Sequence, residues 1–142
     1  MVGSVPSISR KVSLKEALRL LEDLHAKVPG NPAVTNNYAS ALSRLGRVDE
    51  AIEVMRDCFA QHPEYVFGAA NYLGTLIYAE KLEEAEAMIA NYRLPQRIHP
   101  EAYRAWCRVE MRYYALVGEQ ERFENVQKSL DLVAKEFGQL HD

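Results

Sequence analysis

The chain has 142 residues, of which 48% are hydrophobic and 26% are charged, and its formal net charge is −3. This composition is typical of one ordinary globular domain and excludes a wholly disordered chain. Lysine and arginine are scattered and form no basic run, so we expect no nucleic acid among the partners. No segment is apolar enough to span a bilayer or to act as a secretion signal, so we expect no membrane partner and a cytoplasmic location.

The first helix is predicted over residues 13–28, where apolar residues recur at three- and four-residue steps. Ser13, with Glu16 three residues later, has the pattern of a capping box at the start of this helix. Part of the apolar stripe of this helix has no obvious helix to cover it. That stripe indicates either an end cap or a piece cut from a longer protein.

Six further helices follow with the same period. They are predicted near residues 32–45, 48–62, 66–79, 81–93, 100–117 and 119–137. No segment alternates as a β-strand does, so the predicted class is all-α with about seven antiparallel helices. The helical domain is predicted to span residues 13–142, after a flexible N-terminal segment of residues 1–12.

Residues at several predicted helix ends suit their positions. Asn31 before Pro32, and His99 before Pro100, each fit a capping residue followed by a first-turn proline. Glycine adopts the left-handed backbone that commonly follows a helix C-terminus, so three glycines are expected to end helices. They are Gly46, Gly118 and Gly138.

The sequence repeats itself at the spacing that separates Ala51 from Ala85. The segment from Arg47 to Ala51 is similar to that from Lys81 to Ala85 at all five positions, and the same step back leads to Ala17. Alanine at this position lets two helices approach closely, and a larger side chain there should cost about 1–3 kcal/mol by overpacking. The repeat therefore predicts helix pairs that stack on one another.

This unit resembles the tetratricopeptide repeat (TPR), which consists of helix, turn and helix. The segment from Pro32 to Tyr65 matches it best. Its matching positions are Tyr38, Ala39, Leu42, Gly46, Val48, Ala51, Met55, Cys58 and Pro63. The resemblance implies a right-handed α-α superhelix, a TPR-like solenoid, that binds other proteins.

The later copies depart from the family's pattern. Glu80 stands at the turn position that the family gives to glycine, and the helix around Tyr72 fits either the strict offset or a register one residue later. In the third copy we expect a three-residue insertion within residues 94–97, which places Trp106 and Tyr113 at the family's aromatic positions. The last helix is then expected to bury an apolar stripe of Phe123, Val126, Leu130, Val133 and Phe137.

The resemblance also implies a concave groove lined by the first helix of each pair, where a partner peptide or helix would bind. The predicted binding residues are Asn37, Asn71, Tyr78, Arg104, Arg108 and Tyr114. Asparagine can hold a peptide backbone as both donor and acceptor, and paired arginines suit a carboxylate. The predicted partner is a protein or peptide, and an acidic or C-terminal peptide would suit the arginines.

Part of this set resembles the carboxylate clamp of tetratricopeptide repeats that bind chaperone tails. Asn71, Arg104 and Arg108 match positions of the clamp. Asn36 and Ser40 stand where the clamp has lysine and asparagine, so a complete clamp is absent. The alternative is that the two arginines are ordinary solvated helix charges.

Signals for an enzyme, a metal site or a cofactor are weak. The four histidines are dispersed, and the two cysteines, Cys58 and Cys107, form no CxxC pair, so we predict neither a metal site nor a disulfide framework. No nucleophile elbow or phosphate-binding loop occurs, so we predict no enzyme and no cofactor. Cys58 is expected to be buried and inert.

Two alternatives to partner binding stay open. One is a homo-oligomerisation segment of a larger protein that uses its first or last helix as the contact. The other is a small secretion-type chaperone, which the chain resembles in size and class.

Overall fold

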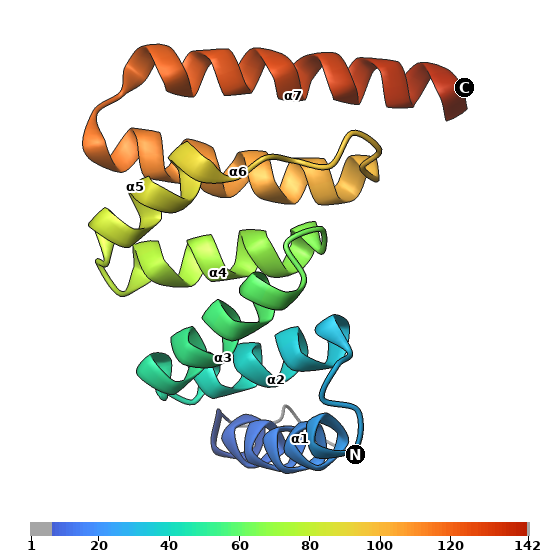
Figure 1. The fold of residues 1–142 in the computed structure, drawn as a ribbon, viewed down its shortest axis with the longest axis vertical. Helices are drawn as coiled ribbons and strands as arrows, with labels where there is room; N and C mark the ends of the chain where they lie inside the picture. The colour runs from blue at the N-terminus through green and yellow to red at the C-terminus, as the bar shows by residue number, and fades with distance from the viewer. Residues whose placement is uncertain (1–6, 142) are drawn as a thin grey trace. The chain divides into compact units, whose positions relative to one another are not determined.

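The structure is a computed structural model that describes the backbone of residues 7–141 and the side chains of residues 13–136. All regular structure in that part of the chain is α-helical, and no strand occurs in it. Its helices follow one another as α1 to α7 (Figure 1). Their bounds are Ser7–Lys27, Pro32–Arg44, Val48–Gln61, Val66–Tyr78, Leu82–Asn91, Pro100–Val117 and Gln120–His141. The predicted all-α class with about seven helices is confirmed.

The first helix starts earlier than predicted. α1 begins at Ser7, so Ser13 lies inside the helix and is not its N-cap. Residues 7–12 contain neither glycine nor proline, the two residues that most disfavour a helix interior. The rest of the segment predicted to be flexible, residues 1–6, lies outside the described residues.

Side chains cap α2 and α6 as predicted. The Oδ1 atom of Asn31 accepts hydrogen bonds from the backbone N–H groups of Ala33 and Val34 at 3.0 and 3.2 Å. The Nδ1 atom of His99 accepts one from the backbone N–H of Glu101 at 3.1 Å. Each cap satisfies donors that have no partner within the first turn of a helix.

Three helices end with the same backbone motif. A residue with positive φ is followed by an N–H that donates to a carbonyl five residues earlier, as in a Schellman turn. The bonded pairs, donor first, are Arg47 to Leu42 at 2.9 Å, Lys81 to Leu76 at 2.8 Å and Glu119 to Tyr114 at 2.9 Å. The positive-φ residues are Gly46, Glu80 and Gly118, with φ of 87°, 61° and 80°. Gly138 does not end α7, which continues to His141, because one glycine costs a helix only about 1 kcal/mol.

These turns fix the register of the repeats. Arg47 and Lys81 are separated by the same step as Ala51 and Ala85, so the second copy keeps the strict offset at its turn. The step from Lys81 to Glu119 is longer, and the third copy contains four extra residues. The predicted three-residue insertion is therefore wrong by one residue. The segment before α6 is irregular, so only the turn that follows the helix reveals the true count.

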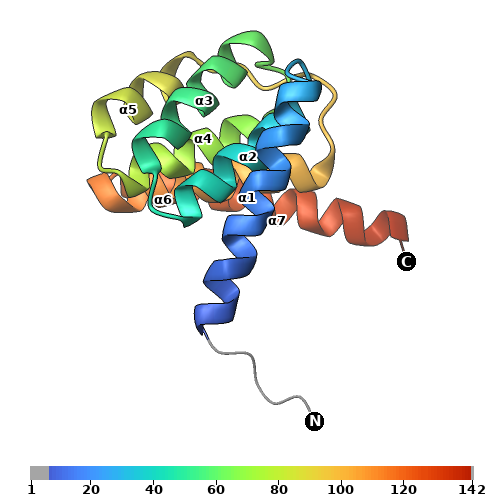
Figure 2. The same ribbon diagram turned by 90° about the horizontal axis from the view of Figure 1, so that it is seen from below.

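The chain divides into two compact units, Met1–Thr75 and Leu76–Asp142, and the boundary lies within α4. In the first unit, α1 packs against α2 and α2 packs against α3 (Figure 2). Leu42 and Ile52 are among its largest fully buried side chains, and Ala51, next to Ile52 in sequence, is fully buried as well. Ala17, at the equivalent position of α1, is only half-buried.

In the second unit, α6 packs against α7. Ala85 of α5 is fully buried, and the rings of Tyr92 and Trp106 lie 4.7 Å apart. The stripe predicted to be buried on the last helix is only partly covered. Its described members, Phe123, Val126, Leu130 and Val133, are half-buried, and Phe137 lies outside the described side chains.

We predict that Glu80→Gly raises the free energy of unfolding by about 1 kcal/mol. Glu80 has a φ of 61°, a left-handed conformation in which a Cβ atom costs roughly 1–2 kcal/mol. Glycine removes that cost. Part of the gain in stability is lost, however, because glycine gives the unfolded chain more conformational entropy. Urea unfolding followed by circular dichroism measures the change.

Gly46→Ala is the matched control because Gly46 occupies the same place in the preceding turn, with a φ of 87°. It should lower the free energy of unfolding by about 1 kcal/mol. Destabilisation by both substitutions would contradict the view that Glu80 is strained.

Candidate interaction surfaces

A polar cluster joins α2 to the start of α4 in the first unit. The Nδ2 atom of Asn71 donates hydrogen bonds to Oδ1 of Asn36 and Oγ of Ser40, both at 2.8 Å. The backbone carbonyl of Asn71 also accepts a bond from the Thr75 hydroxyl at 2.8 Å. The amide of Asn71, predicted to contact a partner, therefore fixes one helix of the chain against another.

Asn37 lies next to this cluster but has a different environment. Its side chain is exposed, and it lines a hollow of about 300 Å³ between α1 and α2. Ser40 and Arg44 line the same hollow from α2, and Leu14 and Leu21 line it from α1. Asn37 and Asn71 are thus equivalent in sequence but not in role, because the amide of Asn71 bonds to a neighbouring helix whereas the side chain of Asn37 is exposed.

The face of α1 that lacks a neighbour is apolar in places. Leu20 is 70% exposed, and Leu24 and Val28 are also exposed. The sequence predicted that the stripe with Leu14, Leu18 and Leu21 would be partly uncovered, and Leu14 and Leu21 are half-buried. Leu18 is the buried member of the helix.

Tyr78 is the last residue of α4 and belongs to the second unit. The residue is 75% exposed, as one that contacts a partner must be before binding. Aromatic side chains supply a large contact area at little cost in conformational entropy, which makes an exposed tyrosine suitable for an interface.

Arg104 and Arg108 line one groove of about 470 Å³ between α6 and α7. Arg112 lines it as well, so three arginines spaced four residues apart follow one side of α6. Nη1 of Arg104 donates to Oε1 of Glu101 at 3.1 Å, which leaves this guanidinium partly engaged. The sequence predicted the first two arginines but missed Arg112, because the assumed register was one residue short.

The same error explains Tyr114, the one predicted binding residue that is buried. Only 6% of Tyr114 is exposed, and its hydroxyl donates to Oε2 of Glu110 at 3.0 Å. In the true register Tyr114 is equivalent to Leu42 and Leu76, which are fully buried. The prediction that Tyr114 contacts a partner is therefore wrong, and its side chain packs inside the protein instead.

Burial changes the protonation of several groups around Tyr114. Burial and the neighbouring Glu110 carboxyl raise the pKa of Tyr114 to about 12. Burial also raises the pKa of Glu110, and it raises that of the Cys107 thiol to about 11. Cys107 is therefore protonated at neutral pH and suited to packing, not to nucleophilic chemistry.

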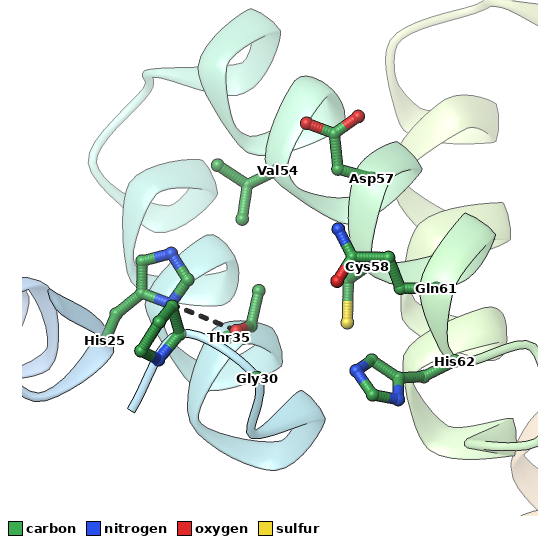
Figure 3. A pocket seen from close by; sticks show the side chains of 9 residues that line it. His25, Gly30, Thr35, Val54, Asp57, Cys58, Gln61 and His62 are labelled. Carbon is green, nitrogen blue, oxygen red and sulfur yellow. Dashed lines mark hydrogen bonds between the residues drawn. The ribbon is translucent and has the colours of Figure 1, made fainter. Parts of the chain in front are cut away.

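A second pocket of about 400 Å³ in the first unit was not predicted (Figure 3). His25 of α1 lies on one side of it, and Cys58 and His62 from the end of α3 lie across from it. Nδ1 of His25 lies 3.0 Å from the Thr35 hydroxyl, and its ring stacks on Tyr38 at 5.2 Å. These contacts join residues from separate helices, and no local motif in the sequence indicates them.

The pocket has little reactive chemistry. Burial, with a smaller effect of Glu64, raises the pKa of the Cys58 thiol. The prediction that Cys58 is buried is wrong, because the residue is only half-buried. No three potential metal ligands cluster anywhere among the described residues. In the same part of the chain, none of the helices has both the length and the apolar character needed to cross a membrane.

Helix pairs, the repeated turn and the fully buried alanines agree with a comparison against protein families. Residues 13–65 match the tetratricopeptide repeat. The predicted resemblance is thus confirmed over residues 13–65, and the tetratricopeptide repeat is in general a protein-interaction module. Neither curated proteins nor solved structures gave a match.

We predict that Asn71→Ala lowers the free energy of unfolding by about 1–3 kcal/mol, whereas Asn37→Ala changes it by less than about 0.5 kcal/mol. The first substitution removes two interhelical hydrogen bonds and leaves Asn36 and Ser40 without their donor. The second removes an exposed side chain. Urea unfolding of the two variants measures the difference, and equal effects would show that the cluster is not a stabilising contact.

Proposed function

We propose that this chain is a non-catalytic module that binds a peptide or helix of a partner protein through exposed residues of α2, α4 and α6. The observation that carries the proposal is the tetratricopeptide match of residues 13–65. In each of the three helices, at least one predicted contact residue is exposed or lines an open hollow. These residues are Asn37, Tyr78, Arg104 and Arg108.

The chemistry of these positions favours a polypeptide ligand. An exposed amide can pair with a peptide group, a tyrosine ring offers apolar area, and guanidinium groups bind carboxylates in a fixed geometry. Tyr114 is not part of this surface because it is buried, and Asn71 contributes by holding α4 against α2. Homo-oligomerisation remains the alternative, and the exposed Leu20 and Leu24 on α1 favour it.

The test is capture of the partner from a lysate, followed by affinity measurements with the purified partner. We expect the double substitution Asn37→Ala and Tyr78→Ala, and the pair Arg104→Ala with Arg108→Ala, each to weaken binding about tenfold or more. Helicity by circular dichroism should stay unchanged, because all four side chains lie outside the core.

Matched controls are Glu53→Ala and Glu86→Ala, which remove exposed side chains from α3 and α5. They should leave affinity within about twofold. If the control variants lost as much affinity as the variants of α2, α4 and α6, the proposal that these three helices form the contact would be overturned. Sedimentation over a range of concentrations tests the alternative, because a chain that stays monomeric rules out homo-oligomerisation.

A further inference from the structure

The open groove between α6 and α7 has an equivalent earlier in the chain that is occupied. The repeat turns relate Arg47 of the first copy to Glu119 of the third, and this step assigns each residue of the first copy an equivalent in the third. Four residues from α3 and its C-cap line the contact with α4, and their equivalents line the α6–α7 groove. The four pairs are Met55 and Gln127, Cys58 and Leu130, Phe59 and Asp131, and His62 and Ala134.

In the first unit, the start of α4 fills this groove. Gly68 and Ala69 of α4 line the contact opposite α2 and α3, and the ring of Tyr72 lies 5.7 Å from that of Phe59. Only about 10 Å³ of space is left there, whereas the groove between α6 and α7 holds about 470 Å³. The open groove therefore has the form of a seat for one α-helix.

The polar contact that holds α4 indicates what that helix must carry. Asn71 of α4 donates to Asn36 and Ser40 of α2. By the step from Arg47 to Glu119, the equivalents of these two acceptors are Arg108 and Arg112, which line the open groove. A guanidinium group only donates hydrogen bonds, so a helix seated here needs an acceptor at the place where α4 has Asn71. Among protein side chains, a carboxylate pairs with arginine through short, charge-assisted hydrogen bonds.

The charges around the groove support an acidic occupant. Within residues 13–136, neither Arg108 nor Arg112 forms an ion pair, and like charges four residues apart destabilise a helix. Arg104 is paired with Glu101, and the one acidic residue that lines the groove, Asp131, accepts a hydrogen bond from Gln127 at 3.0 Å. Met111, Phe123 and Leu130 add apolar surface between the charges.

We propose that the α6–α7 groove binds an amphipathic α-helix of a partner protein, with an aspartate or glutamate that bridges Arg108 and Arg112. This inference rests on the proposed function and adds the site, the conformation and the charge of the ligand. The helix takes the place relative to α6 and α7 that α4 takes relative to α2 and α3.

The chain itself supplies a probe. A fluorescent peptide of residues 64–80, with Glu in place of Asn71, combines the packing face of α4 with the required carboxylate. The affinities for the full chain are measured by fluorescence anisotropy. The Glu peptide should bind about tenfold more tightly than the peptide with Asn71, and the peptide with Lys at this position should bind most weakly. A further peptide with Ala70→Pro should lose binding, because proline breaks the helix.

The variant Arg108→Glu with Arg112→Glu should reverse the order, so that the Lys peptide binds about tenfold more tightly than the Glu peptide. The control Arg97→Glu with Lys128→Glu makes the same change in net charge at exposed positions that do not line the groove. It should keep the original order. Both variants must show wild-type helicity. A third variant, Arg108→Gln with Arg112→Gln, adds no acidic group and should bind the Glu and Lys peptides equally.

Equal affinity for the Glu and Lys peptides, or an order that the Arg108 and Arg112 substitutions leave unchanged, would overturn the inference. Undiminished binding of the proline peptide would overturn the helical conformation of the ligand. Self-association that disappears in the charge-reversed variant would assign the groove to a second copy of this chain instead. If these tests fail while the Asn37 and Tyr78 substitutions still weaken partner capture, the proposed function stands without this site.

Discussion

Close approach of paired helices at a small residue is the constraint on which the structure depends. Ala51 and Ala85 are completely buried and stand one repeat apart, and a Schellman turn precedes each of the helices that carry them. The turn fixes where the second helix of a pair begins, and the alanine lets that helix pack without a side chain in the way. Larger residues such as Leu42 and Ile52 then fill the surrounding core.

The third copy relaxes this constraint, and its binding potential follows from that. Phe123 replaces the buried alanine in the true register and is half-buried at the edge of an open groove. Positions that are uncharged in α2, Asn36 and Ser40, become Arg108 and Arg112 in α6. The equivalent groove between α2 and α3 accepts an uncharged helix, α4. The groove between α6 and α7 instead requires a helix that carries a carboxylate. Specificity of this kind comes from donors that only one class of ligand can satisfy.

Much of the fold could be predicted from the sequence because its signals are local and periodic. The apolar period, the Asn31 and His99 caps and the regular repeat offset can all be found by inspecting the chain alone. The third copy could not be aligned in this way, since the irregular segment before α6 hides the length of the insertion. One residue of error was enough to place Tyr114 on the wrong face, because a helix turns by about 100° per residue.

The candidate sites were harder to predict than the helices, because they depend on contacts between helices. Asn37 and Asn71 are indistinguishable by offset, yet only Asn71 has two acceptors within reach. The pocket between His25 and Cys58 likewise joins separate helices. The sequence shows which residues are polar and on which period, but the packing of a neighbouring helix decides whether a polar side chain binds inside the chain or faces a partner.

Substitution of the buried alanines tests the central constraint most directly. Ala51→Leu should lower the free energy of unfolding by about 1–3 kcal/mol, because a larger side chain must push two packed helices apart. Ala60→Leu, at an exposed position of the same helix, should change it by less than about 0.5 kcal/mol in the same urea titration. Equal stabilities for the two variants would contradict the account of close helix pairing.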